Sequence, residues 1–346
     1  MPILSGHLNA RLDTMVSLEQ EKSRPSSARA AIIYNPVHAP LLRLRDAVAT
    51  QERLMGWRRS SWHETAAEDA GRQAALDAAN TAPDVVLVAG GDGTIRAAVD
   101  AIRESRVPIA LLPLGTGNLL ARNLSVPLTD LEASVEAAFT GRDRAIDIGL
   151  AELEHEDGAR TSHVFLVMAG MGLDAAMAEH TSRTAKKRLG WLAYVSPIAR
   201  SIIANQLFHL DYRVDRGRVR STRAHTIIVG NCGTLTGNML LIPSAVIDDG
   251  LLDVIAIRPT GFWSWARIGA RLTLHDAARR FRVRSRVPRQ RADFHGLSYT
   301  QGKVFEARFA TPHAIELDGD LFGHVTRVRI TVQEGAIRLR TSASGR

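Results

Sequence analysis

Two glycine-rich segments contain the residues of this chain that are best suited to chemistry. The first is Gly90-Gly91-Asp92-Gly93-Thr94, and the second is Pro113-Leu114-Gly115-Thr116-Gly117-Asn118. Glycines let backbone N–H groups approach phosphate oxygens closely, and a following helix adds partial positive charge at its N-terminus. Because Asp92 would repel phosphates without a divalent cation between them, the first segment predicts a phosphate site that uses Mg²⁺. The alternative for this segment is a tight turn in which Asp92 caps a helix.

Other patterns limit what this site can be. Asn35-Pro36 is a third candidate, because its amide could hold a nucleotide, although Asn-Pro is also a common turn. The chain has no GxxxxGK[ST] segment, which excludes a P-loop, and no GxGxxG opens a helix, which disfavours a dinucleotide fold. The histidines show no HExxH pattern. The single cysteine, Cys232, excludes a disulfide scaffold and a Cys-based zinc site and fits a reducing compartment.

The elements that must position these segments alternate between strands and helices. Strands of a buried type are expected over 30–34, 84–89 and 108–113, and helices over 66–79 and 94–104. This alternation predicts a parallel, doubly wound (Rossmann-like) α/β domain, in which the carboxyl ends of the strands meet at one edge. Since Asn35 and both glycine-rich segments follow such strands, we expect them to form one cleft.

The pattern becomes rich in strands after Asp147. Strands are expected over 164–168, 226–229, 252–257, 303–309 and 325–331, with helical regions near 185–205 and 262–280. We predict a second, mostly antiparallel domain. The expected bounds are 1–29 for a disordered extension, 30–146 for the nucleotide-binding α/β domain and 147–331 for the β-rich domain, and residues of about 332–346 could return to the first domain.

Composition and charge exclude several classes of protein. With 346 residues, 45% of them hydrophobic, the chain is too long and too apolar for a disordered tail. The longest uncharged stretch, Thr226 to Ile247, contains three Gly, two Asn and a Pro, so we expect a strand, a loop and a strand rather than a membrane span. The formal charge of +8 is local, because residues 262–291 contain nine Arg and one acid, Asp276.

The arginine-rich segment 262–291 predicts a surface that adsorbs to anionic membranes. Trp263 and Trp265 precede apolar residues on an expected helix, with arginines on another face. Each basic residue near an anionic membrane contributes about 1 kcal/mol. The alternative is a solvated basic face, and nucleic-acid binding is disfavoured because no known binding module is present. We expect a cytoplasmic protein that associates peripherally with the inner face of the membrane.

Seen together, the segments occur in the order of a known family. Ile33-Tyr34-Asn35-Pro36, the two glycine-rich segments and Ala145-Ile146-Asp147-Ile148-Gly149 fill the first half. Segments 165–175, 187–194 and 243–253 and the turn sequence Leu317-Asp318-Gly319-Asp320 follow. Over about residues 30–340 this succession resembles the diacylglycerol kinase catalytic-domain family, in its bacterial soluble lipid kinase branch. The resemblance implies a β-sandwich as the second, lipid-substrate domain and a nucleotide in the cleft between the domains.

The resemblance also implies an activity and the residues that perform it. A lipid kinase of this family transfers the γ-phosphoryl group of ATP, with Mg²⁺, to a lipid hydroxyl; diacylglycerol, giving phosphatidic acid, is the first acceptor implied, and a sphingoid or other hydroxylated lipid is the alternative. Members often form homodimers. The nucleotide contacts carry over to Asn35, Gly90, Gly91, Gly93, Thr94, Gly115, Thr116, Gly117 and Asn118.

Acidic residues take the remaining implied roles. Asp92 and Asp147 would organise Mg²⁺ through water, with Asp92 taking part in catalysis. Asp318 would be the base that takes the proton from the lipid hydroxyl. Asp249 and Asp253 resemble an acidic pair that binds a structural cation in the second domain of bacterial members, and the alternative for them is a solvated β-turn.

Two positions depart from the family pattern. Leu119 stands where many members have an acid directly after the Asn of the second segment, and Asp320 replaces the Glu of the usual Asp-Gly-Glu. NAD kinase, in the same superfamily, resembles the chain less, because no Asn-Glu dipeptide occurs in it. A third hypothesis, which Leu119 keeps open, is a catalytically weak nucleotide-binding regulator that is recruited to membranes.

Overall fold

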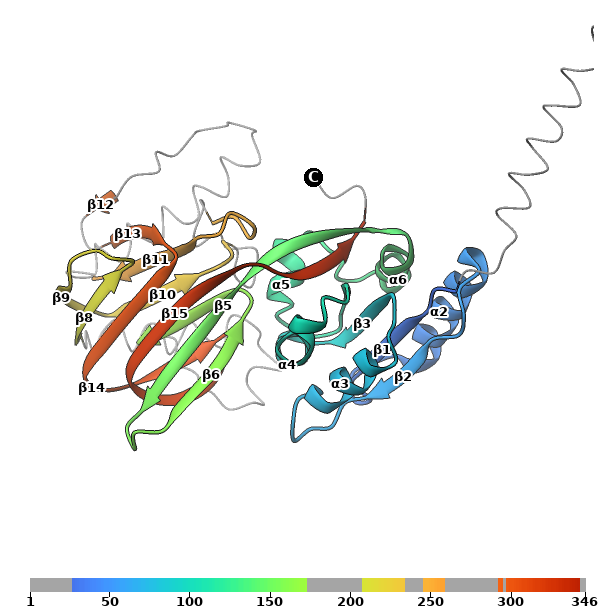
Figure 1. The fold of residues 1–346 in the computed structure, drawn as a ribbon, viewed down its shortest axis with the longest axis horizontal. Helices are drawn as coiled ribbons and strands as arrows, with labels where there is room; N and C mark the ends of the chain where they lie inside the picture. The colour runs from blue at the N-terminus through green and yellow to red at the C-terminus, as the bar shows by residue number, and fades with distance from the viewer. Residues whose placement is uncertain (1–26, 173–206, 234–244, 259–291, 295–296, 343–346) are drawn as a thin grey trace, which may run out of the picture.

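The computed structural model describes residues 27–172, 207–233, 245–258, 292–294 and 297–342. Figure 1 shows two bodies side by side, one that mixes helices with strands and one that is built from strands. Several predicted segments lie outside the described residues: residues 1–26 of the expected extension 1–29, the helical regions near 185–205 and 262–280, and the arginine-rich segment 262–291. In the part that is described, no helix has the length and apolar character needed to cross a membrane.

The first body is organised around a parallel sheet. Its four strands follow the spatial order β4-β3-β1-β2. Their bounds are β1 Ala30–Tyr34, β2 Ser61–Glu64, β3 Val85–Gly90 and β4 Ile109–Pro113. Apart from the edge strand β2, these strands are buried throughout, which explains why they are continuous apolar runs in the sequence.

Helices cover both faces of this sheet. Helices α3 (Arg72–Asn80) and α4 (Asp92–Ile102) pack on one face, and α2 (Leu41–Met55) and α6 (Leu131–Thr140) pack on the other. The buried apolar residues of α4 recur at helical spacing: Ile95, Ala98, Val99 and Ile102. A short helix, α5 (Leu119–Asn123), and a 3₁₀ turn, η1 (Arg103–Ser105), complete the body. The predicted α/β architecture is thereby confirmed.

The second body is mostly antiparallel. Its core packs large side chains such as Phe165, Phe305 and Ile315 between layers of strands. The strands, which Figure 1 labels, are β5 Arg142–His155, β6 Arg160–Phe165, β7 Met168–Gly172, β8 Phe208–Val214, β9 Arg220–Ala224, β10 Thr226–Gly230, β11 Leu252–Ile257, β12 Ala292–Phe294, β13 Leu297–Gly302, β14 Val304–Leu317 and β15 Asp320–Thr341. The expected β-sandwich-like second domain is confirmed.

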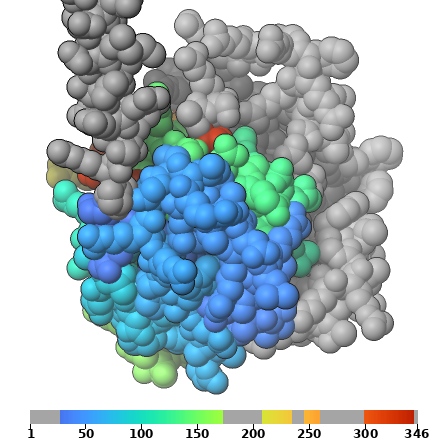
Figure 2. Space-filling model, turned by 90° about the vertical axis from the view of Figure 1, so that its right-hand side faces the viewer, coloured from blue at the N-terminus to red at the C-terminus, as the bar shows by residue number. Residues whose placement is uncertain are grey.

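Strand β15 joins the two bodies. It pairs antiparallel with β14 and β5, and at its far end Leu339 and Arg340 pair in parallel with β4. The expected segment of about 332–346 therefore includes residues that lie beside the first sheet. Figure 2 shows the molecule from the right-hand side of Figure 1, where the blue surface comes from the early residues of the α/β body. The domain bounds themselves stay a prediction.

Candidate active site

The two glycine-rich segments lie against each other at the carboxyl ends of β3 and β4. The N–H of Leu114 donates to the carbonyl of Gly90 at 3.0 Å. The backbones are so close that a Cβ placed on Gly115 would lie 2.6 Å from the Cα of Gly91. Asn35 follows β1 at the same edge, and its N–H donates to the carbonyl of Ala89 at 3.1 Å. The structure thus brings these three sequence-predicted segments together.

The second glycine loop is closed by its own asparagine. Asn118 adopts a left-handed conformation, with φ 48° and ψ 46°, which asparagine tolerates better than most residues. Its side chain is buried, accepts from the N–H of Gly115 at 2.9 Å and donates to the carbonyl of Gly115 at 2.8 Å. These two hydrogen bonds within the loop fix its shape.

Asp92 connects the two loops. It begins α4, and its Oδ1 accepts from the N–H of Leu119 at 2.6 Å, at the start of α5. Burial raises the pKa of Asp92, against the lowering effect of the amides of residues 118–120, and the nearby Asp320 raises it further. A Cβ on Gly117 would lie 2.6 Å from Oδ2 of Asp92, so a side chain at this position would displace the Asp92 carboxylate. Asp92 does cap a helix, but the helix is α5 and not the one that Asp92 begins.

Asn35 and Thr94 are also engaged locally. The Oδ1 of Asn35 accepts from the N–H of Val37 at 3.0 Å, which is the turn that Asn-Pro sequences commonly form. Thr94 is buried, and a Cβ on Gly90 would lie 2.7 Å from the Cβ of Thr94. These contacts give both residues a part in the shape of this edge of the sheet.

Asp318 lies in a tight turn between β14 and β15. Both Asp318 and Gly319 have positive φ, at 53° and 86°. Three consecutive backbone N–H groups donate to the Asp318 carboxylate: those of Leu166 at 2.8 Å, Val167 at 2.8 Å and Met168 at 3.1 Å. Asp318 is only 7% exposed, and burial raises the pKa of its carboxyl group to about 6, against the lowering effect of the three amides and of Arg96. Its predicted role as a base stays a prediction.

The same turn contacts the first glycine loop through Asp320. A Cβ on Gly93 would lie 3.2 Å from Oδ2 of Asp320, and Arg96 of α4 donates to that oxygen at 2.7 Å. Sequence reasoning missed Arg96. The available signal was its position four residues after Asp92, because residues four apart on a helix share one face.

The other predicted metal ligands lie elsewhere. Asp147 is buried in β5, and its two carboxylate oxygens accept from the N–H groups of Gly250 and Gly335, both at 2.7 Å. These bonds tie β5 to the turn before β11 and to β15, and the role of Asp147 at Mg²⁺ stays a prediction. Asp249 accepts from the N–H of Leu251 at 3.1 Å, while buried Asp253 accepts from Tyr299 and Gln301. Among the described residues, no three His, Cys, Asp or Glu side chains gather as a metal site.

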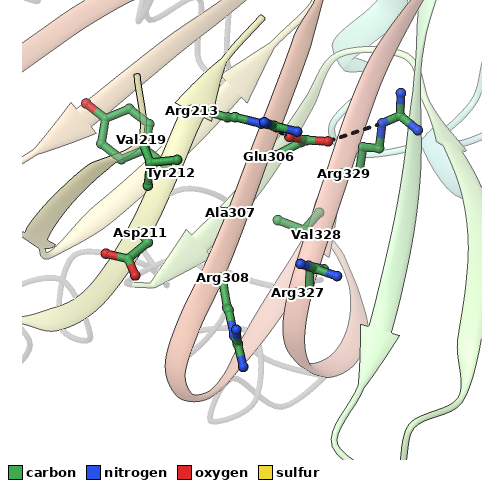
Figure 3. Close-up of a pocket in the computed structure, with 10 residues that line it drawn as sticks. All are labelled: Asp211, Tyr212, Arg213, Val219, Glu306, Ala307, Arg308, Arg327, Val328 and Arg329. Atoms are coloured by element: carbon green, nitrogen blue, oxygen red, sulfur yellow. Dashed lines mark hydrogen bonds and ion pairs between the residues drawn. The ribbon is translucent and has the colours of Figure 1, made fainter. Parts of the chain in front are cut away.

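A hollow of about 470 Å³ lies on the open face of the β-rich body. In Figure 3, Glu306 lies between Arg213 and Arg329, and it forms ion pairs with both. None of the sequence-predicted site residues lines this hollow. Its lining consists of Asp211, Tyr212, Arg213, Val219, Glu306, Ala307, Arg308, Arg327, Val328 and Arg329.

Comparison with known proteins decides the family. The model of the diacylglycerol kinase catalytic domain matches residues 29–151, and that of the YegS C-terminal NAD kinase beta sandwich-like domain matches residues 167–269, together more than half of the chain. The chain belongs to the diacylglycerol kinase catalytic-domain family. The predicted family and the predicted enzyme class, a lipid kinase, are thereby confirmed.

Relatives of this lipid kinase support the same grouping. It is 29% identical over 286 residues to "Probable lipid kinase YegS-like" of Pseudomonas aeruginosa (strain UCBPP-PA14), covering 80% of this chain and 83% of the relative. It is 25% identical over 243 residues to "Diacylglycerol kinase" of Bacillus subtilis (strain 168), covering 69% and 77%. A crystal structure of a candidate diacylglycerol kinase from Bacillus anthracis str. Sterne has the same fold, with a TM-score of 0.72, 21% identity and coverage of 94% and 99%.

Proposed function

We propose that this lipid kinase transfers the γ-phosphoryl group of ATP to a lipid hydroxyl, with diacylglycerol as the first acceptor and a sphingoid or other hydroxylated lipid as the alternative. The observation that carries the proposal is the close approach of Asp320, in the acidic turn of the other domain, to Gly93 in the first glycine loop, where an added Cβ would lie 3.2 Å from the Asp320 carboxylate. A phosphate on the loop would face carboxylates across the cleft. The names of relatives that are diacylglycerol kinases support this choice of acceptor.

The glycine loops fit the phosphates of a nucleotide. Gly91 and Gly93 have no side chain that would keep a phosphate away from their backbone, and the N-terminus of the 11-residue helix α4 adds positive potential there. Mg²⁺, when bound, would neutralise charge on the phosphates. Asp92 fits a role in holding the water shell of this cation, because its carboxylate lies between the two loops. We assign the remaining nucleotide contacts to Asn35, Gly90, Thr94 and residues 115–118.

Asp318 is our proposed acceptor for the proton of the lipid hydroxyl. A general base works best when its pKa is near the operating pH, and the pKa of Asp318, raised by burial to about 6, meets this condition. The amides of residues 166–168 hold its carboxylate in one orientation. In a loose phosphoryl-transfer transition state, such positioning matters more than base strength.

We further propose that the enzyme works at the cytoplasmic face of an anionic membrane, because its acceptor is a lipid. The arginine-rich segment 262–291 is the proposed contact, since its charge would favour adsorption. Replacing Arg279, Arg280, Arg282 and Arg284 by Glu is expected to abolish sedimentation with anionic vesicles at low salt. Unchanged sedimentation would contradict this part of the proposal.

A panel of lipids tests the activity. Diacylglycerol, a sphingoid base, ceramide and a short-chain soluble diacylglycerol would be presented in mixed micelles with γ-labelled ATP, with and without Mg²⁺. We expect Mg²⁺-dependent transfer of label to diacylglycerol at a higher kcat/KM than to the other lipid classes. Label on a sphingoid lipid alone would select the alternative acceptor, and ATP turnover with no labelled lipid would contradict the proposal.

The contact between the loops makes Gly115→Ala a test of nucleotide binding. The added Cβ would meet backbone of Gly91, which cannot rotate away, so the loops must separate. A hydrogen bond to a charged group contributes about 1.5–3 kcal/mol, and about 1.4 kcal/mol is tenfold in affinity, so the loss of one phosphate contact should weaken ATP binding at least about 10-fold. Isothermal titration calorimetry with ATP and Mg²⁺ measures this.

The matched control is Gly158→Ala, in the turn between β5 and β6. Gly158 has a φ of 82°, but an added Cβ would have nothing within 4 Å. This variant should lose about 1 kcal/mol of stability from backbone strain and keep its ATP affinity. Equal ATP affinity in both variants would remove the second loop from the nucleotide site.

A further inference from the structure

Arg96 occupies an unusual place between the two domains. It belongs to α4, one helical turn after Asp92, but its guanidinium donates to Oδ2 of Asp320 in the β-rich domain at 2.7 Å. The side chain of Arg96 is 15% exposed, whereas that of Asp320 is 55% exposed. The ion pair thus has a largely enclosed cation and an open carboxylate, which differs from an ordinary pair at the protein surface.

An aromatic ring fixes the plane of the same guanidinium. Its Cζ lies 4.6 Å from the centre of the Phe322 ring, and Phe322 in turn contacts the ring of His163 at 4.6 Å between centroids. The Nε of Arg96 is buried and has no hydrogen-bond partner within the described ranges. With the ring on its face and Asp320 at one nitrogen, the guanidinium has one well-defined position.

Both ends of this contact belong to the proposed reaction site. Arg96 is two residues beyond Thr94 of the first glycine loop, and Asp320 is two residues beyond Asp318. Asp320 also lies close to Gly93, which is part of the first glycine loop. Any change in the Arg96 contact would therefore move the acidic turn relative to the loop that we propose to hold phosphate.

We propose that Arg96 is a positioning residue for phosphoryl transfer, which holds the Leu317–Asp320 turn of the β-rich domain against the phosphate loop of the α/β domain. The inference rests on the proposed function and deepens it. Arg96 does not have to touch the lipid or the nucleotide. Its role is to keep the two halves of the site at one separation while the phosphoryl group moves between them.

Steady-state kinetics of Arg96→Met tests this role. Methionine keeps the apolar contact with Phe322 but removes the ion pair with Asp320. We expect kcat on micellar diacylglycerol to fall about 10- to 100-fold, while the KM for ATP changes less than about 3-fold, because the loop that binds nucleotide is intact. Arg96→Lys keeps the charge without the planar guanidinium and should recover part of kcat.

The control is Arg103→Met. Arg103 also pairs with an aspartate, Asp100 of α4, at 2.5 Å, but this pair lies within the α/β domain. The kcat of Arg103→Met should stay within about 2-fold of the wild-type kcat. A wild-type kcat in Arg96→Met, or an equal loss of kcat in Arg103→Met, would overturn the proposal.

A second measurement separates this proposal from the proposed activity. If the wild type labels no lipid, the proposed function fails, yet the contact can still be tested by urea unfolding of Arg96→Met, Asp320→Asn and the double variant. A stability loss in the double variant smaller than the sum of the two single losses would support an inter-domain contact between these residues. Strictly additive losses would overturn it.

Discussion

Asp318→Asn is expected to lower phosphoryl transfer to lipid by roughly 10²-fold or more, the scale of a lost general base. The change also affects the fold, because asparagine replaces one carboxylate oxygen by an NH₂ group. Both oxygens of Asp318 accept from backbone N–H groups, so the new donor would face at least one of them. A buried amide left without an acceptor costs about 1–3 kcal/mol. Turnover on diacylglycerol and urea unfolding measure the two effects.

A matched control separates catalysis from stability. Asp215 also has a positive φ of 53°, and its Oδ1 accepts from the N–H groups of Lys303 and Val304 at 2.8 and 2.9 Å. Asp215 directly follows β8 and is not one of the proposed site residues. Asp215→Asn should therefore lose stability and keep its activity. Near-normal turnover in Asp318→Asn would remove Asp318 from the mechanism.

The pH dependence of stability gives an independent check on Asp318. The pKa of this group in the folded protein, about 6, lies above its ordinary value of 3.8, so folding favours the protonated form. Its stabilising contribution is therefore fully present below about pH 4 and is lost as the pH rises through about 6. We expect the stability advantage of the wild type over Asp318→Asn to shrink by roughly 3 kcal/mol between about pH 4 and pH 8. A constant difference would contradict the raised pKa.

Leu119→Asp is expected to destabilise the protein by about 3 kcal/mol or more, although it restores an acid common in the family. Leu119 is 6% exposed and packs in the core that α4 shares with the sheet. Its N–H already donates to Asp92, so the new carboxylate would be buried beside an existing one. Urea unfolding at neutral pH measures the loss.

Leu119→Met serves as the control, because it keeps the volume of the side chain and should cost less than about 1.5 kcal/mol. A Mg²⁺ titration of Leu119→Asp distinguishes the two possible environments of this position. If Mg²⁺ restored wild-type stability to Leu119→Asp, position 119 would be part of a metal network and not part of the core.

Residue patterns predicted strands β1, β3 and β4 and helices α3 and α4 of the α/β domain, because their interactions are local, but they did not predict β2, α2, α5 or α6. The apolar runs of β1, β3 and β4 and the helical spacing of Ile95, Ala98 and Val99 depend on residues close in the chain. The helix expected over 66–79 is α3, over Arg72–Asn80, since Gly71 has a φ of 97° and adopts the left-handed conformation before it.

Long-range contacts could not be predicted in this way. The Arg96–Asp320 pair joins residues 224 positions apart, and nothing in either local sequence indicates the other. Strand β15 extends far beyond the expected 325–331, because Gly323 on one side and Gln333, Glu334 and Gly335 on the other interrupt the pattern of a strand. For Asp147, only the fold shows that the amides of Gly250 and Gly335 meet its carboxylate.

The parallel pairing of β15 with β4 has a consequence for synthesis of the chain on the ribosome. Strand β4 is complete long before Leu339 and Arg340, its partners, are translated. Until then, its outer edge has unpaired backbone N–H and C=O groups, and such edges are prone to wrong pairing with other chains. The first domain therefore cannot finish folding as soon as it leaves the exit tunnel. Its edge is sealed only after the second domain has been made, so the order of translation and the order of assembly differ in this protein.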